Sequence, residues 1–259
     1  MPAPVSGWPH WREENEYAAL LKAGRSAFAW EWLRRVHAYR EAYEEAARCS
    51  SPREHEVLAA RWGLHRFEAP DLPVPVARPL WRRNRFRHVL EAVAEEAVLA
   101  SDRFDLRQFE PLATLHRASS GEEHLLISDG LRGIRLDVVD GSLEAGPVLL
   151  RYRLAGFASV AGPLLVLQRL LAFNRTGRFA PALHKPEVRA TRWVAMLRTY
   201  DAMAAGATQR DIAEALISRD AAAGRWRVAA PTVRSRAQRL VRAARRMAGD
   251  GYLSLLDGS

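Results

Sequence analysis

The segment EAPDLPVPVARP, residues 68–79, restricts the fold more than any other part of the chain. It contains four prolines, and each proline removes a backbone donor and opposes the continuation of a helix. The sequence therefore predicts a break between two structural units here. We expect a helical N-terminal domain at residues 1–68, followed by a proline-rich linker and a connecting helix at residues 69–100.

The segment SAFAWEWLRRVHAYREAYEEAA, residues 26–47, has the pattern of an amphipathic helix. Aromatic and aliphatic residues recur every three or four positions, which places them on one helical face. We expect one long helix here, preceded by a shorter helix that ends at Gly24. Trp30, Trp32 and Tyr39 are expected in the core. The alternative is that they are exposed and contact a second subunit or RNA polymerase.

Residues 101–183 change to the pattern of strands. The short apolar segments HLLISD, GIRLDVVDG and VLLRYRLAG are separated by Asp-Gly and Gly-Pro turns, which predicts a small antiparallel sheet. Asp129-Gly130 and Asp140-Gly141 could belong to acidic metal-binding loops, but Asp-Gly is first a hairpin signal because both positions accept positive φ. The apolar residues 164–173 predict a helix that covers the sheet.

Residues 184–259 return to a helical pattern. One helix is expected to stop before Gly206, and TQRDIAEALI starts another, with Thr208 as N-cap and Asp211 at the position of a capping-box acid. The whole chain is predicted to be an α+β protein, mainly α. It has a helical N-terminal unit, a small antiparallel sheet in the middle and a C-terminal helix-turn-helix bundle.

Positive charge is concentrated at the C-terminal end. The chain has a net charge of +9, and residues 221–259 hold eight arginines against two aspartates, a net charge of +6. A basic protein that is merely solvated spreads its charge along the chain. The asymmetry predicts an acidic partner at this end, of which nucleic acid is the most common.

A helix over residues 232–248 would sort its side chains onto two faces. An apolar stripe is formed by Val233, Ala237, Leu240, Val241, Ala244 and Met247. Arginines and hydroxyl side chains lie on the other side. A solvated helix ordinarily mixes acids and bases because like charges repel each other, yet no acid occurs between Asp220 and Asp250. The arginine face is therefore predicted to bind a polyanion rather than only to keep the helix soluble.

This helix and the one that starts at Thr208 follow the order of a helix-turn-helix, in which the second helix enters the major groove. The connection at residues 218–230 is longer than the usual turn. Ser235, Arg236 and Arg239 are the expected base readers, and the expected phosphate contacts are Arg225, Arg227, Arg242, Arg245 and Arg246. The full set of predicted DNA-binding residues is Thr208, Gln209, Arg225, Arg227, Thr232, Arg234, Ser235, Arg236, Gln238, Arg239, Arg242, Arg245 and Arg246.

The sequence shows none of the motifs that enzymatic chemistry requires. A zinc-binding His-Glu-x-x-His helix, a Walker loop, a dinucleotide fingerprint and a nucleophile elbow are all absent. The single cysteine, Cys49, fits a reducing compartment, and no apolar run is long enough for a membrane span. We expect a cytoplasmic protein that is not an enzyme and has no cofactor, metal ion or membrane partner.

From about Leu125 onward the sequence resembles the proteobacterial DUF 2285 domain family. The resemblance is carried by LLAFNRTGRFAP, VRATRWVAMLRTYDAMAAGATQRDIAEAL and VRSRAQRLVRAARRMAGDGYLSLL. The N-terminal AWEWLRR, YREAY and RWGL are similar to a short transcriptional regulator domain often fused ahead of it. The resemblance implies a regulator of integrative and conjugative elements. Some members activate excision genes, and single-domain relatives act as anti-activators that bind protein.

The sequence therefore predicts a sequence-specific transcriptional regulator whose partner is double-stranded DNA, and the family resemblance implies an activator associated with a mobile element. The N-terminal domain is a candidate contact for RNA polymerase or a regulatory protein, and the sequence gives no oligomeric state. An alternative is an anti-activator whose basic helix docks on an acidic protein surface. A third interpretation is a cryptic nuclease, which predicts metal-dependent cleavage of DNA.

Overall fold

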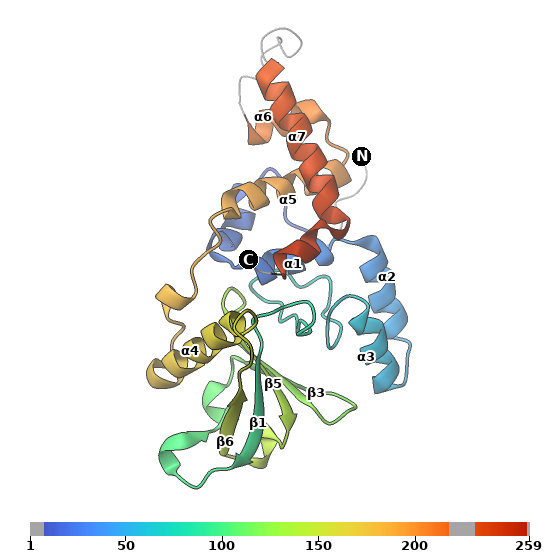
Figure 1. Ribbon diagram of the computed structural model, residues 1–259. Coiled ribbons are helices and arrows are strands. Elements are labelled where there is room, and N and C mark those ends of the chain that lie inside the picture. The colour runs from blue at the N-terminus through green and yellow to red at the C-terminus, as the bar shows by residue number, and fades with distance from the viewer. Residues whose placement is uncertain (1–7, 218–230, 258–259) are drawn as a thin grey trace.

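The computed structural model describes residues 8–217 and 231–257. Figure 1 shows a β-sheet at one end of the molecule and helices α6 (Gln209–Leu216) and α7 (Pro231–Ala248) at the other, with helical layers between them. Helices precede and follow the sheet in the chain order. The predicted α+β class, with helical terminal regions and a central sheet, is confirmed.

The N-terminal region is helical, but the expected long helix at residues 26–47 is divided in two. The elements are the 3-10 helix η1 (Glu14–Lys22) and the α-helices α1 (Arg25–Leu33), α2 (His37–Ala46) and α3 (Pro52–Ala60). Val36 has an extended backbone between α1 and α2. The break accompanies two buried side chains, Arg34 and Arg35, which form ion pairs with Glu31 at 2.7 and 2.5 Å. Local periodicity shows the helical faces but not this turn.

The aromatic residues of this region belong to the core. Trp30, Trp32 and Tyr39 have no exposed surface, so they are not available to a second subunit or to RNA polymerase. Trp30 and Tyr39 pack edge to face at 5.8 Å, a favourable arrangement for aromatic rings.

The sheet has six strands in the order β2-β6-β1-β5-β4-β3. The strands are β1 (Leu90–Glu96), β2 (Arg103–Phe104), β3 (Ala113–Arg117), β4 (Glu123–Ser128), β5 (Gly133–Asp140) and β6 (Val148–Arg153). Neighbouring strands run antiparallel except β1 and β5, which are parallel, with Leu90 opposite Leu136. The central parallel pair was not part of the predicted antiparallel sheet.

Strand β1 corrects the expected connecting helix at residues 69–100. Its buried residues, Leu90, Ala92 and Ala94, alternate with the less buried Glu91, Val93 and Glu95 in the period of a strand. Glu91 and Glu95 pair across the sheet with Arg153 and Arg151 of β6, at 3.2 and 2.7 Å. Strand partners distant in the sequence thus override the helix propensity of the alanine and glutamate residues.

Helix α4 (Ala161–Thr176) lies on the sheet, as the apolar residues 164–173 predicted. Its Val166, Leu170 and Phe173 are buried in one cluster with Leu136 and Val138 of β5. Short 3-10 turns complete the middle region, at η2 (Ala100–Asp102), η3 (Leu106–Phe109), η4 (Leu143–Ala145) and η5 (Pro181–Leu183).

The C-terminal region consists of α5 (Ala190–Ala204), α6, α7 and the 3-10 helix η7 (Asp250–Leu255). Its main core is shared with the N-terminal helices. Phe28 of α1 packs edge to face on Trp193 of α5 at 5.1 Å, and Leu197 and Met247 are buried in the same cluster. The two helical regions, predicted as separate domains, therefore pack as one unit, while the division of the sequence into domains stays a prediction.

Candidate nucleic-acid interface

One face of α7 is buried, and its burial changes along the helix. Ala237 packs against Ala213 of α6, Val241 belongs to a cluster that includes Ile212, and Ala244 enters the main core. The predicted apolar stripe is confirmed. The C-terminal half of α7 is thus anchored in the body of the protein, whereas its N-terminal half rests on α6 and projects from the end of the molecule (Figure 1).

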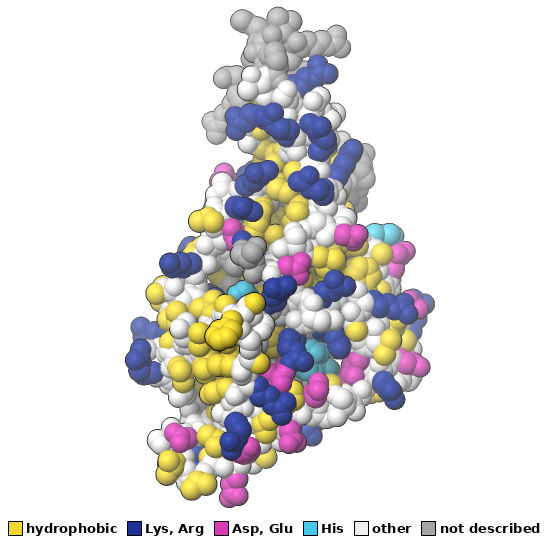
Figure 2. All heavy atoms as spheres, in the orientation of Figure 1, with side chains coloured by type: hydrophobic (Ala, Val, Ile, Leu, Met, Phe, Trp, Pro, Cys, Tyr) yellow, Lys and Arg dark blue, Asp and Glu magenta, His cyan; other side chains and the backbone are white. Residues whose placement is uncertain are grey.

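The opposite face of α7 is exposed and basic. Its exposed predicted residues are Thr232, Arg234, Ser235, Arg236, Arg239, Arg242, Arg245 and Arg246, and Gln238 is half-buried. Figure 2 shows cationic side chains gathered over this end of the molecule, where acidic side chains are sparse. The structure therefore brings together nine of the thirteen predicted residues on one helix.

Within the described parts of the chain, none of the six arginines on α7 forms an ion pair. Elsewhere exposed arginines do pair, as Arg151 does with Glu95. An unpaired guanidinium retains its five donors for an external acceptor, and its planar fork fits phosphate or the guanine edge.

Thr208 and Gln209 lie at the start of α6, and both are exposed. The predicted capping box is confirmed. The backbone N–H of Asp211 donates to Thr208 Oγ1 at 3.2 Å, and the backbone N–H of Thr208 donates to Asp211 Oδ2 at 2.8 Å. The Thr208 hydroxyl also donates to Asp211 Oδ2 at 2.6 Å. This hydroxyl therefore has a structural role at the helix start, and Gln209 is the better placed of the two for an external contact.

Arg225 and Arg227 lie outside the described residues, as does the whole of the predicted connection at 218–230. Their predicted phosphate contacts stay predictions. The interface described here consists of α7 and the start of α6.

A buried network fixes α5, on which α7 packs, to the N-terminal helices. Arg35 donates through Nε and Nη2 to the two carboxylate oxygens of Asp201, at 2.7 and 2.8 Å. The Tyr17 hydroxyl donates to Asp201 at 2.6 Å, and burial together with the Asp201 charge raises the pKa of Tyr17. Burial opposes ionisation of Glu31, yet Arg35 and Arg34 hold its pKa below the usual value. The network makes a rigid support for the basic helix.

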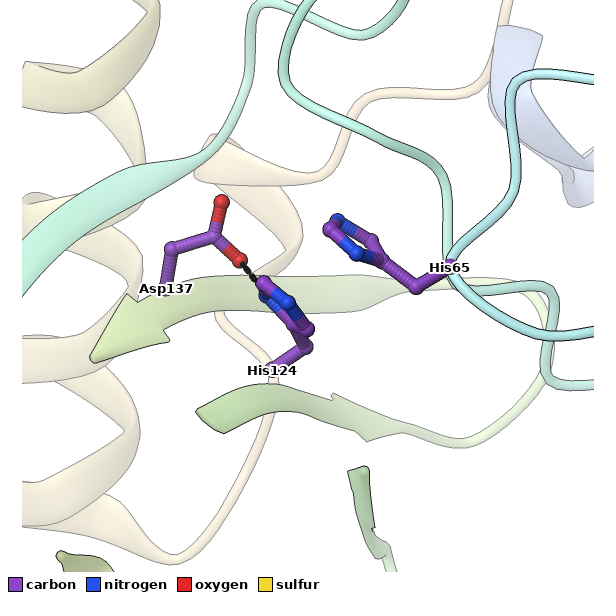
Figure 3. Close-up of side chains that lie close together, drawn as sticks. All are labelled: His65, His124 and Asp137. Carbon is purple, nitrogen blue, oxygen red and sulfur yellow. Dashed lines mark hydrogen bonds and ion pairs between the residues drawn. The ribbon is translucent and has the colours of Figure 1, made fainter. Parts of the chain in front are cut away.

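Sequence reasoning missed a second polar group, formed by His65, His124 and Asp137 (Figure 3). The imidazole rings of His65 and His124 stack with centroids 3.4 Å apart. His124 Nδ1 lies 2.5 Å from Asp137 Oδ1, and Arg135 is paired with the same oxygen at 2.7 Å. Burial, followed by the Arg135 charge, lowers the pKa of His65 to about 2.

These three side chains could offer metal ligands, since their ligand atoms lie within 4.8 Å of one another. The arrangement instead fits a structural contact. Ligands of one metal ion converge on a point, whereas these two imidazole rings lie face to face. The Asp137 carboxylate is already paired with the Arg135 guanidinium. The group joins residues 61–67 to strands β4 and β5. No local sequence pattern indicates this group, because its members lie far apart in the chain.

The structure and two family comparisons define the class of the protein, which is a transcriptional regulator with a DNA-binding domain. Residues 161–257, from α4 to the end of η7, match the RovC model described as "T6SS, Transcription factor, DNA binding domain". Residues 10–67 match the "Proteobacterial transcriptional regulator-like domain". The chain matches no curated protein.

These matches confirm the predicted N-terminal transcriptional regulator domain and the C-terminal DNA-binding region. The DUF 2285 resemblance and the link to integrative and conjugative elements stay predictions. No helix of the described residues combines the length and apolar character needed to cross a membrane.

Proposed function

We propose that the protein is a sequence-specific transcriptional regulator that binds the major groove of DNA with α7. The observation that carries the proposal is a helix inside the matched DNA-binding domain with one buried face and, on its other sides, six arginines that form no ion pair with a described residue. Such a helix can enter a groove without breaking an ion pair of the described structure.

The dimensions of α7 support this assignment. A helix of 18 residues is about 27 Å long, and its less anchored N-terminal half is the part that recognition helices place against base edges. Ser235, Arg236 and Arg239 occupy this half and are the proposed base readers. Arg242, Arg245 and Arg246 follow toward the body of the protein and are the proposed phosphate contacts.

The proposed helix-turn-helix and the proposed mode of regulation rest on the same interface. Helices α5, α6 and α7 pack against one another, an arrangement compatible with a helix-turn-helix unit. Regulation would then result from occupancy of a promoter in the cytoplasm and not from catalysis. Activation and a place on a mobile element follow from the family resemblance. A contact of the N-terminal domain with RNA polymerase or a regulatory protein would use exposed residues other than the buried tryptophans.

The test is DNA binding by the full chain, measured by fluorescence anisotropy on duplexes selected from a random library. Each base contact contributes about 1–3 kcal/mol, so Arg236→Ala combined with Arg239→Ala should weaken binding by roughly 30-fold or more. The matched control is Arg175→Ala with Arg178→Ala, two exposed arginines at the end of α4.

Equal binding by the wild type and the Arg236/Arg239 double variant would overturn the proposal. If the chain selects no duplex, while the same arginines are needed to bind an acidic protein, the anti-activator alternative replaces it. Cleavage of the duplexes with magnesium present would instead support a nuclease.

A further inference from the structure

A cavity of about 440 Å³ lies where the helical regions meet the sheet. Its walls come from the start of α1, the segment between α3 and β1, the β4–β5 turn, α4, the segment before α5, and the residues that end η7. This volume is in the range of small-molecule sites, roughly 300–1,000 Å³. We call it the junction cavity.

The charged lining of the junction cavity is mostly cationic. The cationic residues are Lys22, Arg25, Arg132, Arg135, Arg169 and Lys185. Glu187 is the one acidic lining residue among the described parts of the chain, and it pairs with Arg25 at 2.7 Å. Arg132 and Arg135 pair with aspartates outside the lining. Lys22, Arg169 and Lys185 have no ion pair with any described residue, and they supply the uncompensated charge.

Arg169 is held in place without an acidic partner. Its Nε donates to the carbonyl oxygen of Leu183 at 2.8 Å, and burial lowers its pKa. Its charge also acts on a second lining residue: the pKa of His88 is lowered mainly by burial and, to a smaller extent, by the Arg169 charge. A half-buried guanidinium without a counter-ion is costly, and an anion in the cavity would offset that cost.

The N-terminus of α1 also opens into the junction cavity. Residues 24–27 belong to the lining, the N-cap Gly24 provides no side-chain acceptor, and the first turn contains no acid. The free N–H groups and the positive end of the helix dipole therefore face the cavity. Helix termini of this kind bind carboxylate and phosphate groups.

One buried polar atom of a lining residue has no partner in the described structure. Trp81 is 3% exposed, and its Nε1, which can only donate, makes no hydrogen bond with a described residue. Buried polar groups are nearly always satisfied, so this atom points to a ligand with a hydrogen-bond acceptor.

The lining of the junction cavity also has an apolar part, which includes Val74, Ala77, Phe86, Leu131, Leu255 and Leu256. We infer that the cavity binds a small anionic molecule with an apolar body, whose carboxylate or phosphate group meets Arg169, Lys185 and the start of α1. Inorganic anions alone would leave the apolar wall uncovered.

Occupancy of the junction cavity should alter DNA binding, a step that rests on the proposed function. Leu255 and Leu256 follow α7 through η7, and they are buried in the same core cluster as Ala244 and Met247 of α7. A ligand packed on these leucines therefore acts on the anchored half of the basic helix. The molecule would be an effector that changes the position or stability of α7.

The first test is isothermal titration calorimetry of the full chain, without DNA, using 2-naphthyl phosphate, 2-naphthoate and neutral 2-naphthol. At least one of the two anions should bind about tenfold or more tightly than 2-naphthol, because a charge-assisted hydrogen bond contributes about 1.5–3 kcal/mol. The preferred anion distinguishes a phosphate effector from a carboxylate effector.

Variants locate the binding site. Arg169→Gln should weaken binding of the preferred anion about tenfold. Lys185→Gln, which changes an exposed side chain without an ion pair to any described residue, should weaken it severalfold. The matched control Arg175→Gln removes an exposed charge from the same helix and should leave binding unchanged. Equal affinity for naphthol, no binding of either anion, or unchanged binding by both the Arg169 and Lys185 variants would overturn the proposal.

The second test is the affinity of the chain for DNA with and without a saturating concentration of the preferred anion. A coupling of about fivefold or more is expected, and it should be lost in Arg169→Gln. Unchanged DNA affinity would overturn the effector role. If the chain binds no DNA at all, the proposed function fails, and the calorimetric titration still decides whether the cavity binds an anion.

Discussion

Arg35 and Arg239 are both arginines, but their surroundings differ: Arg35 is buried and Arg239 is exposed. Arg35 is 2% exposed and has two carboxylates, Glu31 and Asp201, as ion-pair partners. Arg239 is exposed on α7 and has no ion pair with a described residue. A buried arginine must be compensated within the protein, whereas an exposed one can remain available to a partner at little cost. The comparison separates arginines that stabilise the fold from those that we assign to DNA.

The largest expected effect is a loss of stability when the buried ion pair of Arg35 is broken. Asp201→Ala leaves Arg35 without its bidentate partner and should lower the free energy of unfolding by about 3–5 kcal/mol. Urea denaturation measures the change. The control is Asp71→Ala, which breaks the exposed pair between Arg40 and Asp71 and should cost about 0–1 kcal/mol. Similar losses in the two variants would contradict the distinction.

The second effect concerns pH. The pKa of His65 is lowered by burial, from 6.5 to about 2. Below pH 6.5 the unfolded chain therefore binds a proton that the folded chain does not, and stability falls as the pH falls. This histidine contributes about 1.4 kcal/mol per pH unit between those values. Urea denaturation from pH 7 to pH 5 measures the slope.

His65→Gln should reduce that slope by about 1.4 kcal/mol per pH unit, the contribution of one proton. His88, His116 and His184, whose pKa values burial also lowers, still contribute. His37→Gln changes an exposed histidine and serves as the control. An unchanged slope in His65→Gln would show that His65 is not buried as a neutral side chain.

The smallest expected effect on stability is that of replacing the exposed Arg239. Arg239→Ala changes an exposed side chain that has no ion pair with a described residue, and it should change the free energy of unfolding by less than about 0.5 kcal/mol. The same variant should weaken DNA binding. A loss of stability greater than about 1 kcal/mol would place Arg239 among the structural arginines.

Features with a local period could be predicted from the sequence. The two faces of α7 follow from its 3.6-residue repeat, and the Thr208 and Asp211 cap follows from a spacing of three residues. The arginine face was recognised because no acid lies nearby in the sequence, and no acid pairs with it among the described residues either.

Features that depend on distant partners were missed. Strand β1 resembles a helix in the sequence because Ala and Glu favour helices, and its pairing with β5 and β6 decides the outcome. The core shared by α1 and α5, the His65 group and the junction cavity each join residues more than fifty positions apart. Periodicity within one segment contains no information about such contacts.

The most direct test of the central claim is the salt dependence of DNA binding. Each phosphate contact contributes about 0.9 to the slope of log K against log salt concentration. Arg242→Gln combined with Arg246→Gln should therefore reduce the magnitude of that slope by about 1.8 relative to the wild type, while Arg175→Gln with Arg178→Gln leaves it unchanged. A slope in the Arg242/Arg246 variant equal to that of the wild type would show that the arginine face of α7 does not contact the DNA backbone.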